Sequence, residues 1–232
     1  MDLIKDLNDM QGEAVLHTEG PLLLLAGAGS GKTKVITHRI AHMVGKGVKP
    51  SSILAITFTN KAAKEMKERV SALLNETDIW ISTFHSLCVR ILRREINTID
   101  YTSNFTIYDS ADAERLMKEC LQLMNLDEKM YPAKSMMNHI GNLKDNLKTP
   151  EQYSEEAQHD FRNYRIAELY KLYQSKLKNN NALDFDDIIF KTVEVFKNNV
   201  EVLEKYHKRF LYIMVDEYQD SATRYVMKSC VA

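Results

Sequence analysis

The segment LLLLAGAGSGKT, residues 22–33, constrains the fold of this chain more than any other part of the sequence. Four consecutive leucines are typical of a strand buried on both faces, as in the middle of a parallel sheet. The glycines that follow carry no Cβ, so backbone N–H groups can turn inward and approach an anion closely. Residues 34–44 have helical periodicity, so the loop opens onto the positive end of a helix dipole. The sequence therefore predicts a buried strand, a phosphate-binding loop and a helix in that order.

The loop follows the G-x-x-x-x-G-K-T pattern, except that Ala26 stands at the first glycine position, where a small residue is expected to change little. Lys32 is expected to reach the β- and γ-phosphates of a nucleotide, and the Thr33 hydroxyl to bind Mg²⁺. The alternative is a glycine-rich linker that happens to precede Lys-Thr, and the predicted strand and helix on either side argue against it. The residues expected to surround the phosphates are Ala28, Gly29, Ser30, Gly31, Lys32 and Thr33.

A second apolar run, residues 210–215, ends in an acidic pair, Asp216 and Glu217. Asp216 would hold Mg²⁺ directly or through water, and Glu217 would orient and deprotonate the attacking water. Acids just after a strand are also common in turns, so the acidic pair indicates a nucleotide site only in combination with the phosphate loop. Together the two motifs predict a site for ATP and Mg²⁺, with the turn that ends at Thr33 beside the acidic pair on adjoining strands.

Composition limits the alternatives. The formal net charge of the 232 residues is −1, so any contact with DNA must come from local patches of charge. The sequence contains no run of about 18 apolar residues, so no membrane span is predicted. The N-terminus lacks the charged and then apolar layout of a signal peptide. Cys88, Cys120 and Cys230 form no C-x-x-C pair and are expected to be reduced thiols, which favours a cytoplasmic location.

Gln11 lies in a short predicted helix that begins at Asn8, upstream of the phosphate loop. Its amide carries a donor and an acceptor, which match the adenine edge that carries N6 and N7. An exposed, merely solvated helical glutamine is the alternative, and the spacing alone does not decide between the two.

Two further strand ends carry candidate ligand-binding residues, because sites in open α/β sheets lie at the carboxyl ends of strands. Phe58 follows the predicted strand 53–57 and could stack on a base, or it could fill the core. The polar residues after it could meet phosphates or be solvated: Thr59, Asn60 and Lys61. His85 follows a predicted strand at 80–82, where a structural and a functional role are both open.

From about residue 96 to 181 the pattern changes to amphipathic helices, predicted over 111–124, 134–147 and 161–177. This length suits a helical domain inserted between strands of the sheet. Basic residues on these helices could contact phosphates, but such charges more often form a solvated surface: Arg162, Arg165, Lys171, Lys176 and Lys178.

Three acids follow in LDFDD, residues 183–187, and could suggest a metal. Helix capping accounts for them better. Asp184 is expected to cap the next helix, with Asp186 and Asp187 in its positive first turn.

Six segments in order from residue 7 to 220 resemble the superfamily-1 DNA helicases of the UvrD/PcrA/Rep kind: LNDMQGEAV, AGAGSGKT, ILAITFTNKAAKEM, ISTFHSL, LDFDDII and VDEYQD. The resemblance implies an α/β fold, a RecA-like P-loop NTPase with a parallel sheet flanked by helices. Residues 1–90 and 182–232 would form the first motor domain, and residues 91–181 an inserted all-helical accessory domain. It further implies that Gln11 reads adenine and that single-stranded DNA is contacted by Phe58, Thr59, Asn60, Lys61 and His85.

The implied activity is that of an ATP-dependent 3′–5′ DNA helicase, which acts on single-stranded DNA and single/double-strand junctions and for which DNA repair is one possible pathway. Ser221 and Ala222 stand where the family usually has Thr-Asn, and only residues 221–232 follow Asp220. A second motor domain needs on the order of a hundred residues. It would supply arginines, which in related NTPases contribute about 10³–10⁵ in rate. The chain alone is therefore expected not to unwind DNA.

Two other functions share these motifs. One is the motor portion of a helicase–nuclease subunit, and the other is a nucleotide- or DNA-binding module without turnover. A generic P-loop kinase has no place for the TFTNKAA and STFHS segments at its strand ends.

Overall fold

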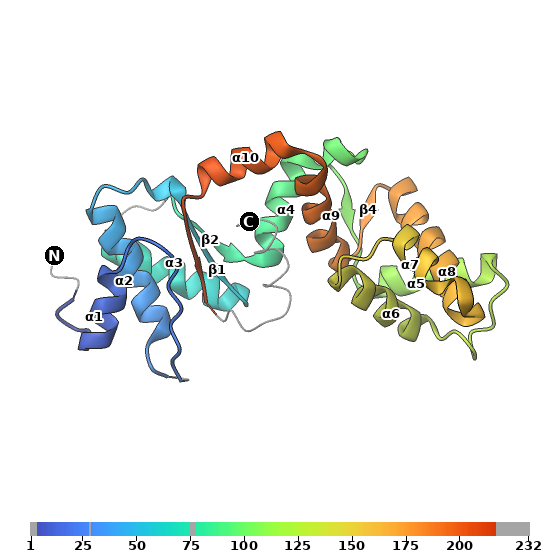
Figure 1. Cartoon of the computed structure of the whole chain (residues 1–232), viewed down its shortest axis with the longest axis horizontal. Helices are drawn as coiled ribbons and strands as arrows, with labels where there is room; N and C mark the ends of the chain where they lie inside the picture. Colours follow the sequence, from blue (N-terminus) through green and yellow to red (C-terminus); the bar gives the residue numbers. More distant parts are fainter. Residues whose placement is uncertain (1–3, 28, 75–77, 217–232) are drawn as a thin grey trace. The chain divides into compact units, whose positions relative to one another are not determined.

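The computed structural model describes residues 4–27, 29–74 and 78–216, which divide into two compact units (Figure 1). The described residues within 1–87 and 204–223 form one of them, here called the sheet unit. Residues 88–203 form the other, here called the helical unit. Each unit has its own core.

The sheet unit is built on three parallel strands in the order β2-β1-β5: β1 (Ile53–Thr57), β2 (Trp80–Thr83) and β5 (Tyr212–Val215). Ala55 in β1 lies opposite Ile81 in β2 and Met214 in β5. Figure 1 shows β5 alongside β1 although the two are far apart in the sequence. Because all three strands run the same way, their carboxyl ends share one edge of the sheet. The strands predicted at 53–57, 80–82 and 210–215 are confirmed.

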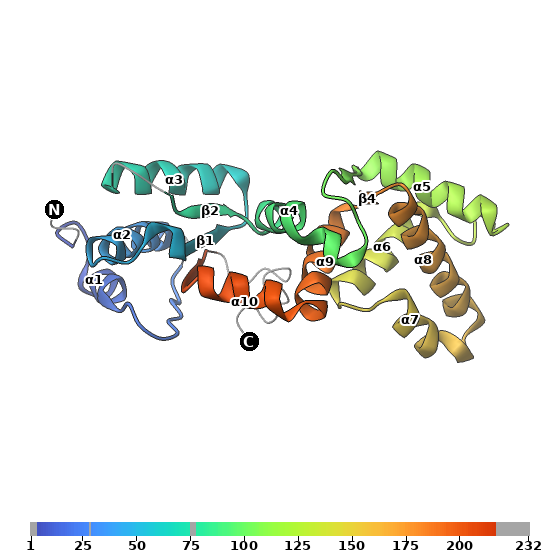
Figure 2. The ribbon, with the colours of Figure 1, turned by 90° about the horizontal axis from the view of Figure 1, so that it is seen from above.

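Helices α2 (Lys32–Gly45) and α3 (Asn60–Leu74) pack on one face of this sheet. Figure 2 shows α3 lying along the strands β1 and β2. Every residue of β1 is buried, as expected for the central strand of a covered sheet. The buried side chains that meet on this face are Ile36, Ile40, Met43, Ile53, Ala55, Met66, Val70, Ile79 and Met214.

Three more helices contribute to the sheet unit. They are α1 (Asp9–Leu16), which Asn8 caps, the beginning of α4 (Phe84–Glu95) and the end of α10 (Val200–Arg209). A 3₁₀ turn, Pro50–Ser52, leads into β1. The ring of Trp80 in β2 meets that of Phe210, which follows α10, with 5.1 Å between centroids, and the Arg209 guanidinium lies 4.4 Å from the Trp80 ring.

The strand predicted from the leucine run does not form, which corrects that expectation. Residues 22–25 have no strand assignment, and they are exposed, with Leu23 68% and Leu25 89% accessible. A run of leucines indicates a need for burial but does not specify what buries it. Among the described residues neither a pairing strand nor a covering helix reaches this run. In the part of the chain that the structure describes, the sheet of this α/β unit therefore consists of β2, β1 and β5, without the leucine run.

The helical unit contains the predicted amphipathic helices as α5 (Ser110–Leu123), α6 (Ala133–Asp145) and α8 (Phe161–Asn179). Besides the rest of α4 and the start of α10, the unit contains α7 (Pro150–Glu156), α9 (Phe185–Asn198), the 3₁₀ turns Ile96–Ile99 and Ala157–His159, and a short parallel pair, β3 (Thr106–Ile107) and β4 (Ala182–Leu183). The pair β3–β4 and helix α7 were not predicted. None of the described helices is long and apolar enough to cross a membrane.

The core of the helical unit is rich in tyrosine. Tyr170 and Tyr173 on α8 are almost fully buried and pack with Leu121 of α5 and Ile140 of α6. Cys88 and Cys120 are buried free thiols, as expected, and Cys230 lies outside the described residues.

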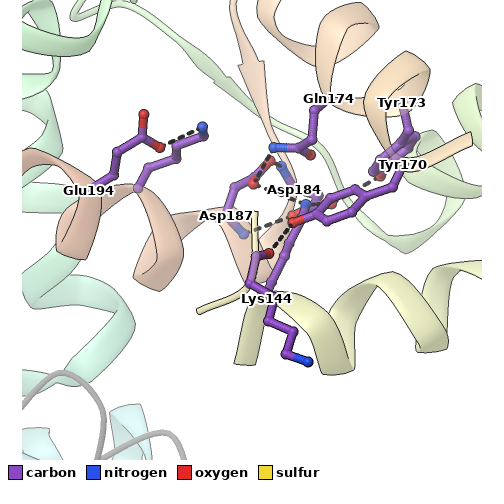
Figure 3. Close-up of polar contacts among 9 residues, drawn as sticks. Lys144, Tyr170, Tyr173, Gln174, Asp184, Asp187 and Glu194 are labelled. Atoms are coloured by element: carbon purple, nitrogen blue, oxygen red, sulfur yellow. Dashed lines mark hydrogen bonds and ion pairs between the residues drawn. The ribbon is translucent and has the colours of Figure 1, made fainter. Parts of the chain in front are cut away.

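Helix α9 belongs to the helical unit, so the chain returns to the sheet unit near residue 204 and not near 182 as expected. Buried charges bind α9 to its neighbours (Figure 3). Lys144 Nζ on α6 lies 2.6 Å from Asp184 Oδ2 and 2.9 Å from Asp187 Oδ1. From α8, Tyr173 donates to Asp184 over 3.0 Å and Gln174 donates to Asp187 over 3.0 Å.

Asp184 also caps α9, as expected, because its Oδ1 accepts from the Asp187 backbone N–H over 2.8 Å. Burial alone would lower the pKa of Lys144, but attraction to Asp184 and Asp187 outweighs burial and raises it. Two of the three acids, Asp184 and Asp187, therefore serve the cap and the ion cluster. Within the described ranges no group of three or more His, Cys, Asp or Glu side chains is placed to hold a metal.

Replacing Lys144 with alanine is expected to destabilise the helical unit by about 3–5 kcal/mol, because two buried carboxylates lose their counter-ion. Lys148→Ala is the matched control, since Lys148 pairs with Glu156 at the surface, and surface pairs contribute about 0–1 kcal/mol. Denaturant unfolding followed by circular dichroism measures both free energies of unfolding. Equal losses in the two variants would contradict a buried ion cluster.

Asp186, in the first turn of α9, predicts a dependence of stability on pH. Burial, followed by the charge of Asp184, raises its pKa to about 6. The folded chain therefore binds a proton that the unfolded chain lacks between about pH 4 and 6, so this residue makes stability fall as pH rises through that window. Asp186→Asn is expected to remove that part of the fall and to raise the unfolding temperature at pH 7.5.

The control for this variant is Asp78→Asn, which changes an exposed carboxylate in the sheet unit. Thermal unfolding of the three proteins from pH 4 to 8 measures the effect. An Asp186→Asn profile parallel to that of the unmodified chain would show that Asp186 ionises normally.

Candidate nucleotide site

The phosphate loop, residues 26–33, turns on two glycines and leads directly into α2. Gly29 has φ 75° and Gly31 has φ 86°, in the left-handed region where a side chain is strained. Between them, Ser30 Oγ donates to the Gly27 carbonyl oxygen over 2.7 Å. The first N–H groups of a helix have no partner within it, so those of α2 are available to an anion held by the loop.

Lys32, the first residue of α2, folds back over the loop. Its ammonium lies 3.2 Å from the carbonyl oxygens of both Ala26 and Gly27. These are exposed hydrogen bonds to neutral acceptors, which a phosphate group can replace at small cost. The ammonium is thus held weakly beside the loop and can turn toward a ligand.

Thr33 meets Asp216, which brings the two predicted motifs together. Thr33 Oγ1 donates to Asp216 Oδ2 over 3.0 Å, although 183 positions separate the two residues. Asp216 directly follows β5, and its backbone N–H donates to the Ile56 carbonyl in β1 over 2.8 Å, which continues the ladder of the sheet. Asp216 is only 8% exposed, and the hydrogen bond from Thr33 holds its carboxylate against the first turn of α2.

These two side chains fit Mg²⁺. Both offer oxygen, the donor that Mg²⁺ prefers. Adjacent ligands in an octahedron with bonds of about 2.1 Å are roughly 3 Å apart, which is the separation of the hydroxyl and carboxylate oxygens.

Gln11 is not simply solvated, because its side chain reaches the phosphate loop. Its Nε2 donates to the Ser30 carbonyl over 2.9 Å, and its Oε1 accepts from the Asn8 backbone N–H over 3.1 Å. The Asn8 side chain in turn accepts from the Gln11 N–H over 2.9 Å. The contact with Ser30 was not predicted, although the N-x-x-Q spacing of a capping box could have indicated that Gln11 is held in place.

The residues that follow β1 and β2 lie at the same edge of the sheet. Phe58 is 63% exposed, so the alternative in which it fills the core is wrong. Thr59 Oγ1 accepts from the Ala62 N–H over 3.1 Å and caps α3, while Asn60 and Lys61 are exposed. His85, in the first turn of α4, is half-buried, and burial lowers its pKa, so its ring is neutral at pH 7.

The basic side chains of the helical unit are largely engaged elsewhere. Arg165 donates to the Met124 carbonyl over 3.1 Å, and Lys171, Lys176 and Lys178 form ion pairs with acids nearby. These contacts favour the ordinary surface role for the four residues. Ala28 and Glu217, both expected at the nucleotide site, lie outside the described residues.

A glycine loop at a helix N-terminus, its lysine, and a threonine–aspartate contact at the carboxyl edge of a parallel sheet define a candidate nucleotide site of the P-loop type. Residues 7–226 match the family described as the UvrD/REP helicase N-terminal domain, and the chain belongs to that family.

Two relatives show how far the similarity extends. The chain is 53% identical over 222 residues to an ATP-dependent DNA helicase PcrA of Staphylococcus epidermidis and 50% identical over 222 residues to one of Staphylococcus aureus. Each match covers 94% of this chain and 30% of the relative. The chain thus spans about a third of the length of these curated relatives.

Proposed function

We propose that this chain is the ATP-binding N-terminal part of an ATP-dependent DNA helicase that moves 3′ to 5′ along single-stranded DNA. The hydrogen bond between Thr33 and Asp216 carries the proposal, because it joins the phosphate loop to the acidic motif at one point. Membership of the UvrD/REP family supports it, as do two similar proteins named ATP-dependent DNA helicase.

Nucleotide binding would use groups that are already close together. The Lys32 ammonium would exchange two backbone carbonyls for the β- and γ-phosphates, and the first N–H groups of α2 would face the phosphates. Gln11 would bind the adenine edge with its amide.

Thr33 and Asp216 are the residues that would hold Mg²⁺, whose charge offsets that of the phosphates. Glu217 follows Asp216 in the sequence and is the proposed base that orients and deprotonates the attacking water.

Single-stranded DNA would lie along the carboxyl edge of β1 and β2. The exposed ring of Phe58 is available to stack on a base, an interaction worth about 1–3 kcal/mol per base. Thr59, Asn60, Lys61 and His85 would contact the backbone of the strand or of a single/double-strand junction.

Unwinding is proposed for the whole protein and not for this chain alone. Translocation needs a second motor domain that closes on ATP and supplies charge to the γ-phosphate. The relatives are about three times as long as the matched region, which leaves room for such a domain in proteins of that length.

Lys32→Ala is expected to weaken ATP binding by roughly ten- to a hundredfold, because hydrogen bonds to a charged partner contribute about 1.5–3 kcal/mol. Lys64→Ala, an exposed lysine on α3, is the matched control and should bind ATP as the unmodified chain does. Titration calorimetry with ATP and Mg²⁺ provides the affinities. Undiminished binding by Lys32→Ala would refute the role of Lys32.

Asp216→Asn is expected to abolish most of the gain in ATP affinity that Mg²⁺ provides, while binding in EDTA changes little. The reason is that the amide keeps an oxygen acceptor for Thr33 but removes the negative charge that attracts the cation. Affinities measured with and without Mg²⁺ test this, with Asp78→Asn as the exposed control. A full Mg²⁺ effect in Asp216→Asn would place the cation elsewhere.

ATP hydrolysis with and without single-stranded DNA separates the two classes of function for this chain. Turnover stimulated by DNA would favour a motor, whereas binding without turnover would favour a nucleotide- or DNA-binding module.

A further inference from the structure

We infer that Gln11 is a brace that holds the phosphate loop in shape, in addition to any contact with the base. The inference rests on the proposed function, since it concerns how the same site prepares for phosphates. Its central observation is the hydrogen bond from Gln11 Nε2 to the Ser30 carbonyl, 2.9 Å long, which joins α1 to a loop 19 positions later. Ser30 stands between two glycines in the left-handed region, Gly29 and Gly31, whose backbone is free to adopt many conformations.

The glutamine is itself fixed from the opposite side. Its Oε1 accepts from the Asn8 N–H, so both ends of the amide are held. Helix α1 is in turn bound to α2, because Arg39 Nη1 donates to the Ala14 carbonyl over 3.0 Å. The segment just before α1 is bound as well, because Lys34 Nζ donates to the Asp6 carbonyl over 2.6 Å. Ala14 and Val15 are also packed against Val35 of α2. The Gln11 brace therefore connects the phosphate loop to a helix that is itself held in place by α2.

Gly31 shows that this contact is close-packed. A Cβ placed on Gly31 would lie 2.9 Å from Gln11 Nε2, so close that the amide would have to move. With φ at 86°, the same residue starts the turn into α2. The backbone angle at position 31 favours glycine, and a side chain there would also displace the Gln11 amide.

The amide has enough hydrogen-bonding groups for two tasks. A glutamine side chain has two N–H donors and two lone pairs, and the contacts with Ser30 and Asn8 use one of each. One N–H and one lone pair remain, which are what the N6 and N7 edge of adenine requires. Reading the base and holding the loop are then compatible in a single orientation of the side chain. A glutamine that only contacts the base should not change the affinity for a ligand that has no base, whereas a glutamine that holds the loop should change it.

The test uses Mg²⁺–tripolyphosphate, which carries phosphates but no base, on the full chain. Gln11→Met keeps the volume of the side chain and removes its hydrogen bonds. Because the hydrogen bond to the loop at Ser30 is lost, tripolyphosphate should bind about two- to tenfold more weakly, and the affinity for ATP should fall further. Asn8→Ala is the control: it removes the helix cap but leaves the Gln11 amide, so tripolyphosphate affinity should stay within about twofold.

Two outcomes would overturn the brace. One is a Gln11→Met variant with weakened affinity for ATP but unchanged affinity for tripolyphosphate, because the glutamine would then act on the base alone. The other is an Asn8→Ala variant whose affinity for tripolyphosphate falls as much as that of Gln11→Met, because the effect would then come from a weakened helix α1.

A second measurement needs no ligand and separates this inference from the proposed function. Amide hydrogen exchange of the phosphate loop should be about two- to tenfold faster in Gln11→Met, with exchange in β1 unchanged. Equal exchange in the two proteins would disprove the brace whether or not the chain binds nucleotide. Conversely, failure of the unmodified chain to bind either ATP or tripolyphosphate would reject the proposed function, while the exchange result would still decide the brace.

Discussion

The candidate site depends on the parallel pairing of β5 with β1. Asp216 continues that pairing by one residue, because its N–H donates to the Ile56 carbonyl, and this fixes where its carboxylate points. Thr33 reaches the carboxylate from the first turn of α2, a helix that packs on the same strands through Ile36 and Ile40. The site is therefore set by the core of the sheet unit, and a shift of β5 by one residue would move the carboxylate to the other face of the sheet.

The features that sequence could predict are those that depend on near neighbours. The loop and the helix after it, the cap at Asp184 and the three apolar strands all follow from residues within a few positions of one another. Chemistry limits the loop further, since left-handed backbone at residues 29 and 31 needs glycine.

The features that sequence could not predict depend on distant partners. The leucines at 22–25 indicated a buried strand, but burial requires a covering element that the run itself does not specify. Helix α9 was expected in the motor domain, yet Lys144, 40 positions before Asp184, binds it to the helical unit. The contact of Gln11 with Ser30 is of the same kind, because a capping box indicates that the side chain is held but not what it touches.

Burial gives two lysines of this chain opposite roles. Lys144 has no exposed side-chain surface and two carboxylate partners, so releasing it would leave buried charge unpaired, and it can only hold its surroundings together. Lys32 rests on two neutral carbonyls in an exposed loop, each at 3.2 Å, and water or a phosphate can replace either at small cost. An ammonium that must move to a ligand has to be weakly held in its absence. The loop meets that requirement by giving Lys32 backbone partners, while Gln11, and not the lysine, holds the backbone in place.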